Sequence, residues 1–418
     1  MPTASDLVTD LPADFETFGQ AVATSMADLL GGTTGQVLSK TSNTDMDFTW
    51  TTPNPGDITA VTAGTGITGG GTSGAVTVSF DQANYGGGQY AAGKNKIING
   101  DFYWNQRNFS STTSDSIYTF DRFRTRVTGD GTATYTAQTF TAGTAPVSGY
   151  EGKNYIRIVT TGQTATNTRA CYRTNIESVR SFAGQTVTIS FWAKSGSGTP
   201  KIASLLSQSF GIGGSSSVDS PAGTVTISTS WARDSLTVAV PSIAGKTIGT
   251  LDSVLIDFSV SAGSDFNTPY SSIGIQSNTF EIWGVQVEAG STATPFQTAS
   301  GSLSGELALC QRYYVRFNSA YTYGTVTTGG YNTSTTNAIS SVPFPVEMRS
   351  TDSISVDYST LQVASSVGAS TVTAVAISQI SRLIASCDFT SSGMVAASPN
   401  YIRQNNSANA YLAFFSDY

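Results

Sequence analysis

Histidine is absent from this 418-residue chain. Its absence excludes Ser-His-Asp and Cys-His catalytic arrangements, histidine-containing metal sites and the usual general base near neutral pH. Charged residues are also scarce at 12%, about half of the usual share. Because glycine, serine, threonine and asparagine are abundant, the exposed surface must be mostly neutral and polar.

Only three cysteines are present, far apart in the sequence: Cys171, Cys310 and Cys387. Their number and spacing predict neither a disulfide framework nor a CxxC metal site. We expect three buried, reduced thiols, since free cysteine usually behaves as a small buried apolar residue. No calcium-binding loop stands out, and we expect no cofactor.

The chain lacks an excess of positive charge and any long apolar run. Its formal net charge is -7 and its pI about 4.6, which argues against a surface for nucleic acid. No run approaches ~18 apolar residues, and no basic segment followed by an apolar core opens the chain. We therefore expect that the protein is synthesised in a cytoplasm and does not insert into a membrane. Both an ordinary cytoplasmic protein and one later exposed on a particle would fit this expectation.

Two distant aromatic stretches stand out. Residues 95–109 place apolar and aromatic side chains around a turn-forming Asn99-Gly100-Asp101, which predicts a strand, a tight turn and a second strand. Residues 280–297 alternate apolar and polar side chains before Gly290 and Pro295. We expect the two stretches to form the first and last strands of one sandwich.

Between these stretches the sequence has a period of two. In residues 186–195, Val187, Ile189 and Phe191 alternate with Thr188 and Ser190. Turn clusters rich in glycine and serine separate such segments, which is typical of an antiparallel sandwich. The fold class is therefore predicted to be mainly β. Three tryptophans of this region are expected to pack in its core: Trp104, Trp192 and Trp283.

Six blocks in this order resemble recurrent blocks of bacteriophage tail-fibre and tail-appendage proteins. They are Asn99–Arg107, Phe120–Arg124, Thr186–Gly198, Glu281–Gln297, Glu306–Tyr314 and Phe344–Ser350. Proteins of this kind contain a jelly-roll region similar to carbohydrate-binding modules, and they are commonly homotrimers. The resemblance implies a virion protein of the tail appendage, a trimer, and a jelly-roll over residues 95–298.

The strongest helical pattern covers residues 13–30. Its apolar residues recur every three or four positions, as an amphipathic helix requires. They are Phe15, Phe18, Val22, Met26 and Leu29. The helix would pack on its own domain, or residues 1–32 would form a region that joins subunits and anchors them to other virion proteins. Isolated short helices are marginal in water, which favours the second interpretation.

Two further regions flank the expected jelly-roll. Residues 33–94 contain short β patterns and glycine-rich turns, which predict a β-hairpin adaptor or shaft with a flexible linker at 81–94. Residues 299–418 contain a short helical pattern at 303–309 and alternating strands, which predict a small C-terminal β domain.

Exposed aromatic rings are the usual platform for a glycan. Tyr321, Tyr323 and Tyr331 lie in a loop-rich stretch of the C-terminal region and are the candidate receptor-binding residues, since tyrosine offers a flat apolar face and a wet hydroxyl. The same tyrosines would alternatively fill the core of that domain or a subunit interface.

A glycosidase is the strongest enzymatic alternative, because a carboxylate pair needs no histidine. The acidic candidates in β-patterned segments are Glu151, Glu177, Glu281 and Glu288. An odd separation places Glu281 and Glu288 on opposite faces of a regular strand, and no pair stands out. We expect no enzymatic activity.

The sequence thus predicts a virion structural protein, a tail fibre or appendage that attaches to the bacterial surface by binding a glycan. The N-terminal region would contact other virion tail proteins, and the remainder would face the host. The alternatives are a purely architectural component, such as a head fibre or connector, and a glycan depolymerase.

Overall fold

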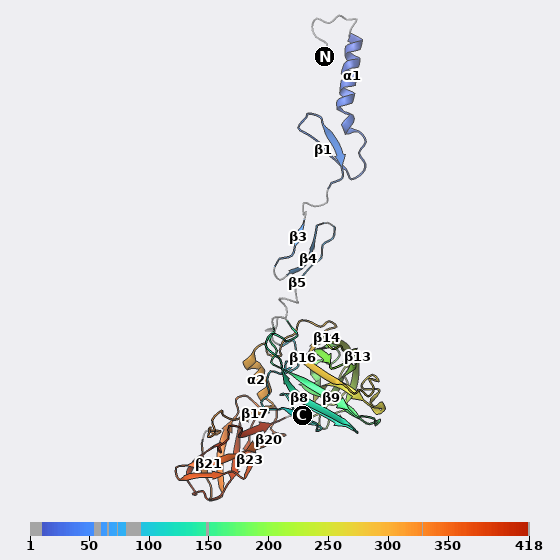
Figure 1. The fold of residues 1–418 in the computed structure, drawn as a ribbon. Coiled ribbons are helices and arrows are strands. Elements are labelled where there is room, and N and C mark those ends of the chain that lie inside the picture. Colours follow the sequence, from blue (N-terminus) through green and yellow to red (C-terminus); the bar gives the residue numbers. More distant parts are fainter. Residues whose placement is uncertain are drawn as a thin grey trace. The chain divides into compact units, whose positions relative to one another are not determined.

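The fold is known from a computed structural model. The structure describes residues 11–53, 60–64, 67–72, 74–80, 93–147, 150–327 and 329–416. It is mainly β, with one short N-terminal helix and several antiparallel sheets (Figure 1), which confirms the predicted fold class. The chain divides into two compact units, Met1–Asp81 and Gln82–Tyr418.

The first unit begins with a helix that is shorter than predicted. Helix α1 covers Leu11–Ser25, and a separate 3-10 turn, η1, covers Ala27–Leu29. The prediction of one helix over 13–30 was therefore wrong at its end. Beyond α1 the chain contacts strand β2 (Phe48–Thr51): the Asp28 carboxylate of η1 accepts the backbone N–H of Phe48 at 3.3 Å.

Short β elements make up the rest of this unit. They are β1 (Val37–Lys40), β2 (Phe48–Thr51), β3 (Val61–Thr62), β4 (Ile67–Gly71) and β5 (Val78–Phe80). Strands β1 and β2 form a hairpin, and β3, β4 and β5 form a three-stranded sheet. Among residues 12–53, 60–64, 67–72 and 74–79, no side chain is buried. Most of the predicted linker, residues 81–92, lies outside the described residues.

The second unit contains a jelly-roll sandwich of two antiparallel sheets (Figure 1). One sheet has the order β13-β12-β15-β10-β7 and the other β14-β11-β16-β9-β8-β6. The strands are β6 (Ser111–Thr112), β7 (Phe123–Thr128), β8 (Thr132–Thr139), β9 (Asn154–Thr161), β10 (Arg169–Glu177), β11 (Thr186–Ser195), β12 (Lys201–Ser209), β13 (Val218–Thr226), β14 (Ala232–Ala239), β15 (Ser253–Ala262) and β16 (Thr279–Ala289).

Alternation builds the core of the sandwich. Val187, Ile189 and Phe191 of β11 are fully buried between the sheets, as the period of two predicts. Trp192 and Trp283 are also buried, and their ring centroids lie 5.4 Å apart. Trp104 was wrongly expected in the core, since it is only half buried.

Residues 95–109 were wrongly predicted to form two strands. The structure has turns there, with positive φ at Asn99 (59°) and Phe102 (54°). The Asn99 side chain accepts the N–H of Trp104 and donates to its carbonyl, at 2.9 and 2.8 Å. Such side-chain bonds compete with a regular ladder. The segment still contacts β16, because Val285 donates its N–H to the Gly100 carbonyl at 2.8 Å.

Among the described residues after the sandwich, 299–327 and 329–416, there are one helix and ten strands. Helix α2 covers Leu303–Gln311, as the sequence predicts, and Ser302 caps its N-terminus by accepting the N–H of Gly305. The strands are β17 (Tyr314–Phe317), β18 (Gly330–Asn332), β19 (Asn337–Pro343), β20 (Ser355–Ser359), β21 (Leu361–Ser365), β22 (Gly368–Thr371), β23 (Ala374–Ile380), β24 (Ile384–Thr390), β25 (Pro399–Gln404) and β26 (Tyr411–Phe415). They form the sheets β17-β26-β20 and β22-β21-β25-β18-β19-β24-β23 around a separate apolar core.

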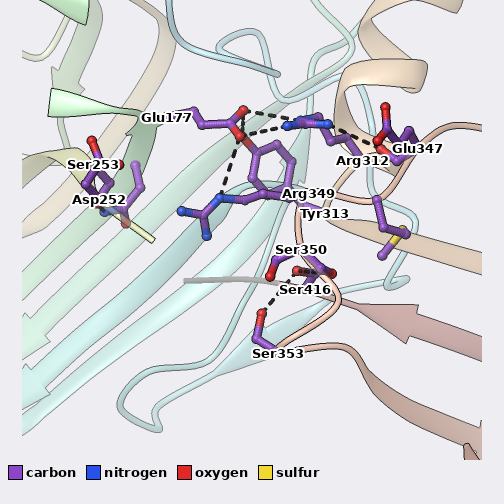
Figure 2. Close-up of polar contacts among 12 residues, drawn as sticks. Glu177, Asp252, Ser253, Arg312, Tyr313, Glu347, Arg349, Ser350, Ser353 and Ser416 are labelled. Carbon is purple, nitrogen blue, oxygen red and sulfur yellow. Dashed lines mark hydrogen bonds and ion pairs between the residues drawn. The ribbon is translucent and has the colours of Figure 1, made fainter. Parts of the chain in front are cut away.

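An ion-pair cluster joins the sandwich to this C-terminal part (Figure 2). Glu177, at the end of β10, accepts hydrogen bonds from Arg312 Nη2 at 2.8 Å and from the Tyr313 hydroxyl at 3.0 Å. Arg349 lies 3.8 Å from the same carboxylate. Burial raises the pKa of Glu177, but the Arg312 hydrogen bonds and charge outweigh it, so the pKa is lowered.

Candidate functional site

The three candidate tyrosines are exposed, so they do not fill the core of the C-terminal part. Their exposed fractions are 79% for Tyr321, 48% for Tyr323 and 53% for Tyr331. Tyr323 and Tyr331 lie against strand β25, whereas Tyr321 lies in the loop before them. The interpretation of these residues as core is therefore excluded.

Strand β25 shows that two of these rings share one sheet face. Its residues alternate, with Asn400, Ile402 and Gln404 buried and Tyr401 turned outward with Arg403. Tyr331 pairs directly with Pro399, which has the same orientation as Tyr401 in the strand.

Tyr323 reaches the same face. Thr325 bridges to Arg403, and the Arg403 guanidinium carbon lies 5.1 Å from the Tyr323 ring centroid and 5.9 Å from that of Tyr401. We call the set Tyr323, Tyr331, Tyr401 and Arg403 the tyrosine face.

Sequence analysis missed Tyr401 and Arg403. Burial alternates along Pro399–Gln404 in the structure, but two of the inward residues, Asn400 and Gln404, are polar. The sequence therefore offered no clear apolar alternation that would mark Tyr401 and Arg403 as outward. What the sequence does not contain is the pairing of β25 with β18, about 70 residues away. Arg403 Nη1 donates to the Tyr401 hydroxyl at 3.4 Å, and no carboxylate lies within ion-pair distance of Arg403 among the described residues.

A second aromatic pair, Tyr103 and Trp104, lines two cavities, and its ring centroids are 5.2 Å apart. Both residues come from the turn segment before β6, and Trp104 Nε1 donates to the Leu303 carbonyl of α2 at 3.2 Å. The cavities have volumes of about 340 and 610 Å³. Such volumes fall in the usual range for small-ligand sites.

The smaller cavity has an apolar lining that includes buried carboxyl groups. Asp101 accepts the Tyr150 hydroxyl at 2.6 Å, and Glu306 accepts the Ser300 hydroxyl at 2.8 Å and the Asn99 N–H at 2.5 Å. Burial raises the pKa of both carboxyl groups. Each group fixes the loops around it, which is a structural role for both.

The four glutamates considered as catalytic carboxylates each contact other residues of the protein. Glu281 bonds Arg157 Nε at 2.7 Å and lies 2.9 Å from Lys194 Nζ. Glu288 accepts the Thr294 hydroxyl at 2.7 Å.

Glu151 accepts the Gly143 N–H at 2.7 Å, and Glu177 belongs to the cluster of Figure 2. None of these contacts pairs one candidate with another.

The placement of Glu281 and Glu288 on opposite faces was wrong. A β-bulge occurs where Ser190 and Trp192 of β11 face Gln286 and Trp283 of β16, so three steps on β16 match two on β11. The bulge changes the alternation and turns both glutamates to one face. It occurs at Gly284, whose φ is +64° and where a Cβ would lie 2.7 Å from the Trp192 ring, so glycine is required there.

Four of the five apolar residues predicted for the N-terminal helix are exposed; Phe15, Phe18 and Val22 lie in α1, and Met26 directly follows it. Phe15 is 63% exposed, and Phe18, Val22 and Met26 are exposed as well. Leu29 is half buried and belongs to η1 rather than to α1. The residues predicted for oligomerisation or anchoring therefore have no core of their own in this unit.

The described ranges contain neither a cluster of metal ligands nor a helix fit to span a membrane. There, no group of three or more acidic or cysteine side chains is placed to bind a metal ion. No helix in the same ranges combines the length and apolar character of a membrane span. The three cysteines are free and buried.

Comparisons with known proteins give structural similarities only. No protein-family model and no curated protein matches the chain. A structure described as "CBM4 structure and function" is 20% identical, with a TM-score of 0.27, and covers 46% of this chain and 100% of that one. The family 11 carbohydrate-binding module from Clostridium thermocellum, in complex with a β-1,3-1,4-mixed-linked tetrasaccharide, is 13% identical (TM-score 0.27) and covers 44% and 98%.

A third similar structure is the enzymatically active domain of tailspike protein 4 of bacteriophage CBA120. It is 15% identical, with a TM-score of 0.26, over 47% of this chain and 21% of that one. With identities and TM-scores this low, these similarities establish neither the function nor the binding site of this chain.

Proposed function

We propose that this chain is a structural and attachment protein of a tailed bacteriophage, located in the tail appendage of the virion, and that it binds a glycan on the host surface. The observation that carries the proposal is the tyrosine face. It gathers three exposed rings and one guanidinium on a single sheet face. The block resemblance in the sequence supports the phage assignment.

The chemistry of the tyrosine face suits a sugar. A tyrosine ring offers an apolar surface to the C–H groups of a pyranose, and its hydroxyl remains in water. The Arg403 guanidinium presents fixed donors that match sugar oxygen atoms in a planar arrangement. Rigid strands carry Tyr331 and Tyr401, so little ordering is needed on binding.

We propose that the N-terminal unit assembles with further copies of the chain and with other virion tail proteins. Its described residues bury no side chain, and a two-stranded hairpin or a 15-residue helix is marginal alone. Apolar contacts from other chains would supply the missing core. A trimer is the assembly that the block resemblance suggests.

Adhesion, architecture and depolymerisation make different predictions. The test uses the full chain with intact bacterial cells and with their isolated surface polysaccharide, and assays released sugars in parallel. Saturable binding without sugar release supports attachment. Release of sugar fragments supports the depolymerase instead, and a folded, assembled chain that binds no cell supports a purely architectural component.

A further inference from the structure

The larger cavity beside Tyr103 and Trp104 differs in chemistry from the tyrosine face. Helix α2, the start of β9, the end of β17 and the loop before β26 contribute to its walls, so it lies between the sandwich and the C-terminal part. Seven side-chain amides line it: Asn105, Gln106, Asn108, Asn154, Gln311, Asn318 and Asn409. Three of them already bond the protein: Asn105 bonds Phe109, Gln106 donates to Asp121 and to the Tyr314 carbonyl, and Asn154 donates to the Phe102 carbonyl. Amide groups donate and accept hydrogen bonds without charge, as a polyhydroxylated ligand requires.

Two cations line the same cavity, and no acidic residue does. The cations are Lys153 and Arg316, and among the described residues neither has a carboxylate within ion-pair distance. The chain as a whole carries a net charge of -7. The charged residues that line this cavity are thus all positive, whereas the chain as a whole is negatively charged.

Neutral groups orient the Arg316 guanidinium. It lies 4.0 Å from the Tyr411 ring centroid, and it donates to the Gln106 and Asn409 carbonyls at 3.4 Å each. Its Nε is buried without a hydrogen-bond partner. The guanidinium is thus positioned but not neutralised, and its charge is available to an anion.

Lys153 lies at the aromatic wall of the cavity. Its Nζ is 4.8 Å from the Tyr103 ring centroid, and the residue is exposed. Tyr103 and Trp104 form the wall against which an apolar ring face can pack. Amides, aromatic rings and two unneutralised cations are thus gathered around one cavity of about 610 Å³.

We propose that this cavity binds an anionic sugar, that is, a glycan residue bearing a carboxylate or phosphate group. Lys153 and Arg316 attract the anionic group, and Tyr103 or Trp104 contacts the ring. The amides of Gln311, Asn318 and Asn409 bond the hydroxyls. This inference rests on the proposed glycan binding and specifies the class of ligand. The tyrosine face is a separate contact with the same surface glycan.

The test measures binding of the full chain to an array of bacterial surface polysaccharides. Each uronate-containing member is paired with its carboxyl-reduced form, and each phosphate-containing member with its dephosphorylated form. The two kinds of pair distinguish the two sources of charge. We expect about tenfold weaker binding after removal of the anionic group, and a similar loss for Lys153→Gln on the acidic members only. The matched control is Lys201→Gln, an exposed lysine outside the cavity lining.

Equal binding to both members of every pair, or Lys153→Gln binding as well as Lys201→Gln, would overturn the inference and leave the proposed attachment intact. Binding to no member, together with no binding to cells, would overturn both. Because the Lys153 side chain is exposed, its substitution is not expected to unfold the protein. Unfolding by denaturant checks this for each variant.

Discussion

The two units of the chain both form secondary structure, but they differ in how far their side chains are buried. In the second unit, alternating strands bury large side chains such as Trp283, Phe191 and Phe258. In the first unit, the described residues also form strands and a helix, yet no side chain of residues 12–53, 60–64, 67–72 and 74–79 is buried. Secondary structure alone therefore does not separate the two units. The difference is the apolar surface that each unit removes from water, and this difference is the basis of our proposal that the first unit assembles with partner chains whereas the second is stable as one chain.

The largest expected effect is a loss of stability on replacing a buried tryptophan, and it tests the contrast between the two units. Trp283→Ala removes a buried ring that packs 5.3 Å from Phe296 and donates to the Asp101 carbonyl at 3.1 Å. We expect a loss of about 3–5 kcal/mol in the free energy of unfolding of the second unit, as for other buried aromatic residues. The matched change in the first unit, Trp50→Ala, should leave that free energy unchanged. Denaturant unfolding followed by circular dichroism measures both, and equal losses would contradict the contrast.

The second prediction concerns assembly through α1. Phe15→Ser combined with Phe18→Ser removes exposed apolar area from one helix face, and it should shift the particle mass from a trimer toward a monomer in light scattering. The unfolding free energy of the second unit should not change. Gln20→Ser, which lies on the opposite side of the helix, is the control. A wild-type chain that is monomeric at micromolar concentration would contradict the proposed assembly.

The third prediction, a smaller effect, compares how much two exposed tyrosines contribute to glycan binding. Tyr401→Ala should weaken glycan binding about tenfold, which is about 1.4 kcal/mol, because Tyr401 lies on the tyrosine face beside Arg403. Tyr321→Ala should cost less, because Tyr321 lies in the preceding loop. Isothermal titration with the surface polysaccharide gives both values. A larger loss for Tyr321→Ala would place the contact in the loop.

The smallest effect concerns the cluster of Figure 2. The Glu177 pKa is lowered from its ordinary value of 4.5, so its stabilising contribution is complete above that value and is lost as the pH falls through the lower, folded-state pKa. Because the carboxylate is 41% exposed, solvent screening limits this contribution to about 1 kcal/mol or less. Glu177→Gln should remove that part of the acid dependence, with Asp219→Asn, at an exposed position outside the cluster, as the control. An unchanged pH profile of unfolding in Glu177→Gln would contradict this role.

The sequence was sufficient where the structure is regular. The period of two predicted strand β11 (Thr186–Ser195) and the apolar residues that it buries, although both faces of this strand are buried, and the pattern at 303–309 predicted α2. It was insufficient at 95–109, where the Asn99 N–H bonds the Glu306 carboxylate 207 positions away. Contacts over such separations override local propensity.

The candidate site was only partly predictable for the same reason. The loop-rich sequence around Tyr323 and Tyr331 indicated exposed rings, but Tyr401 and Arg403 join them through strand pairing alone. The cavity beside Trp104 also combines segments from distant parts of the chain. Similarly, the bulge at Gly284 turns Glu288 to the same sheet face as Glu281. A regular strand alternation does not predict such a bulge.

The most direct test of the central claim is a titration of the full chain against isolated surface polysaccharide from the host cells that it binds. It compares the wild-type chain with the combined variant Tyr331→Ala/Tyr401→Ala, after both are shown to unfold alike. We predict saturable wild-type binding without released sugar, and a loss of at least about tenfold in the variant. Undiminished binding by the variant would contradict attachment through the tyrosine face.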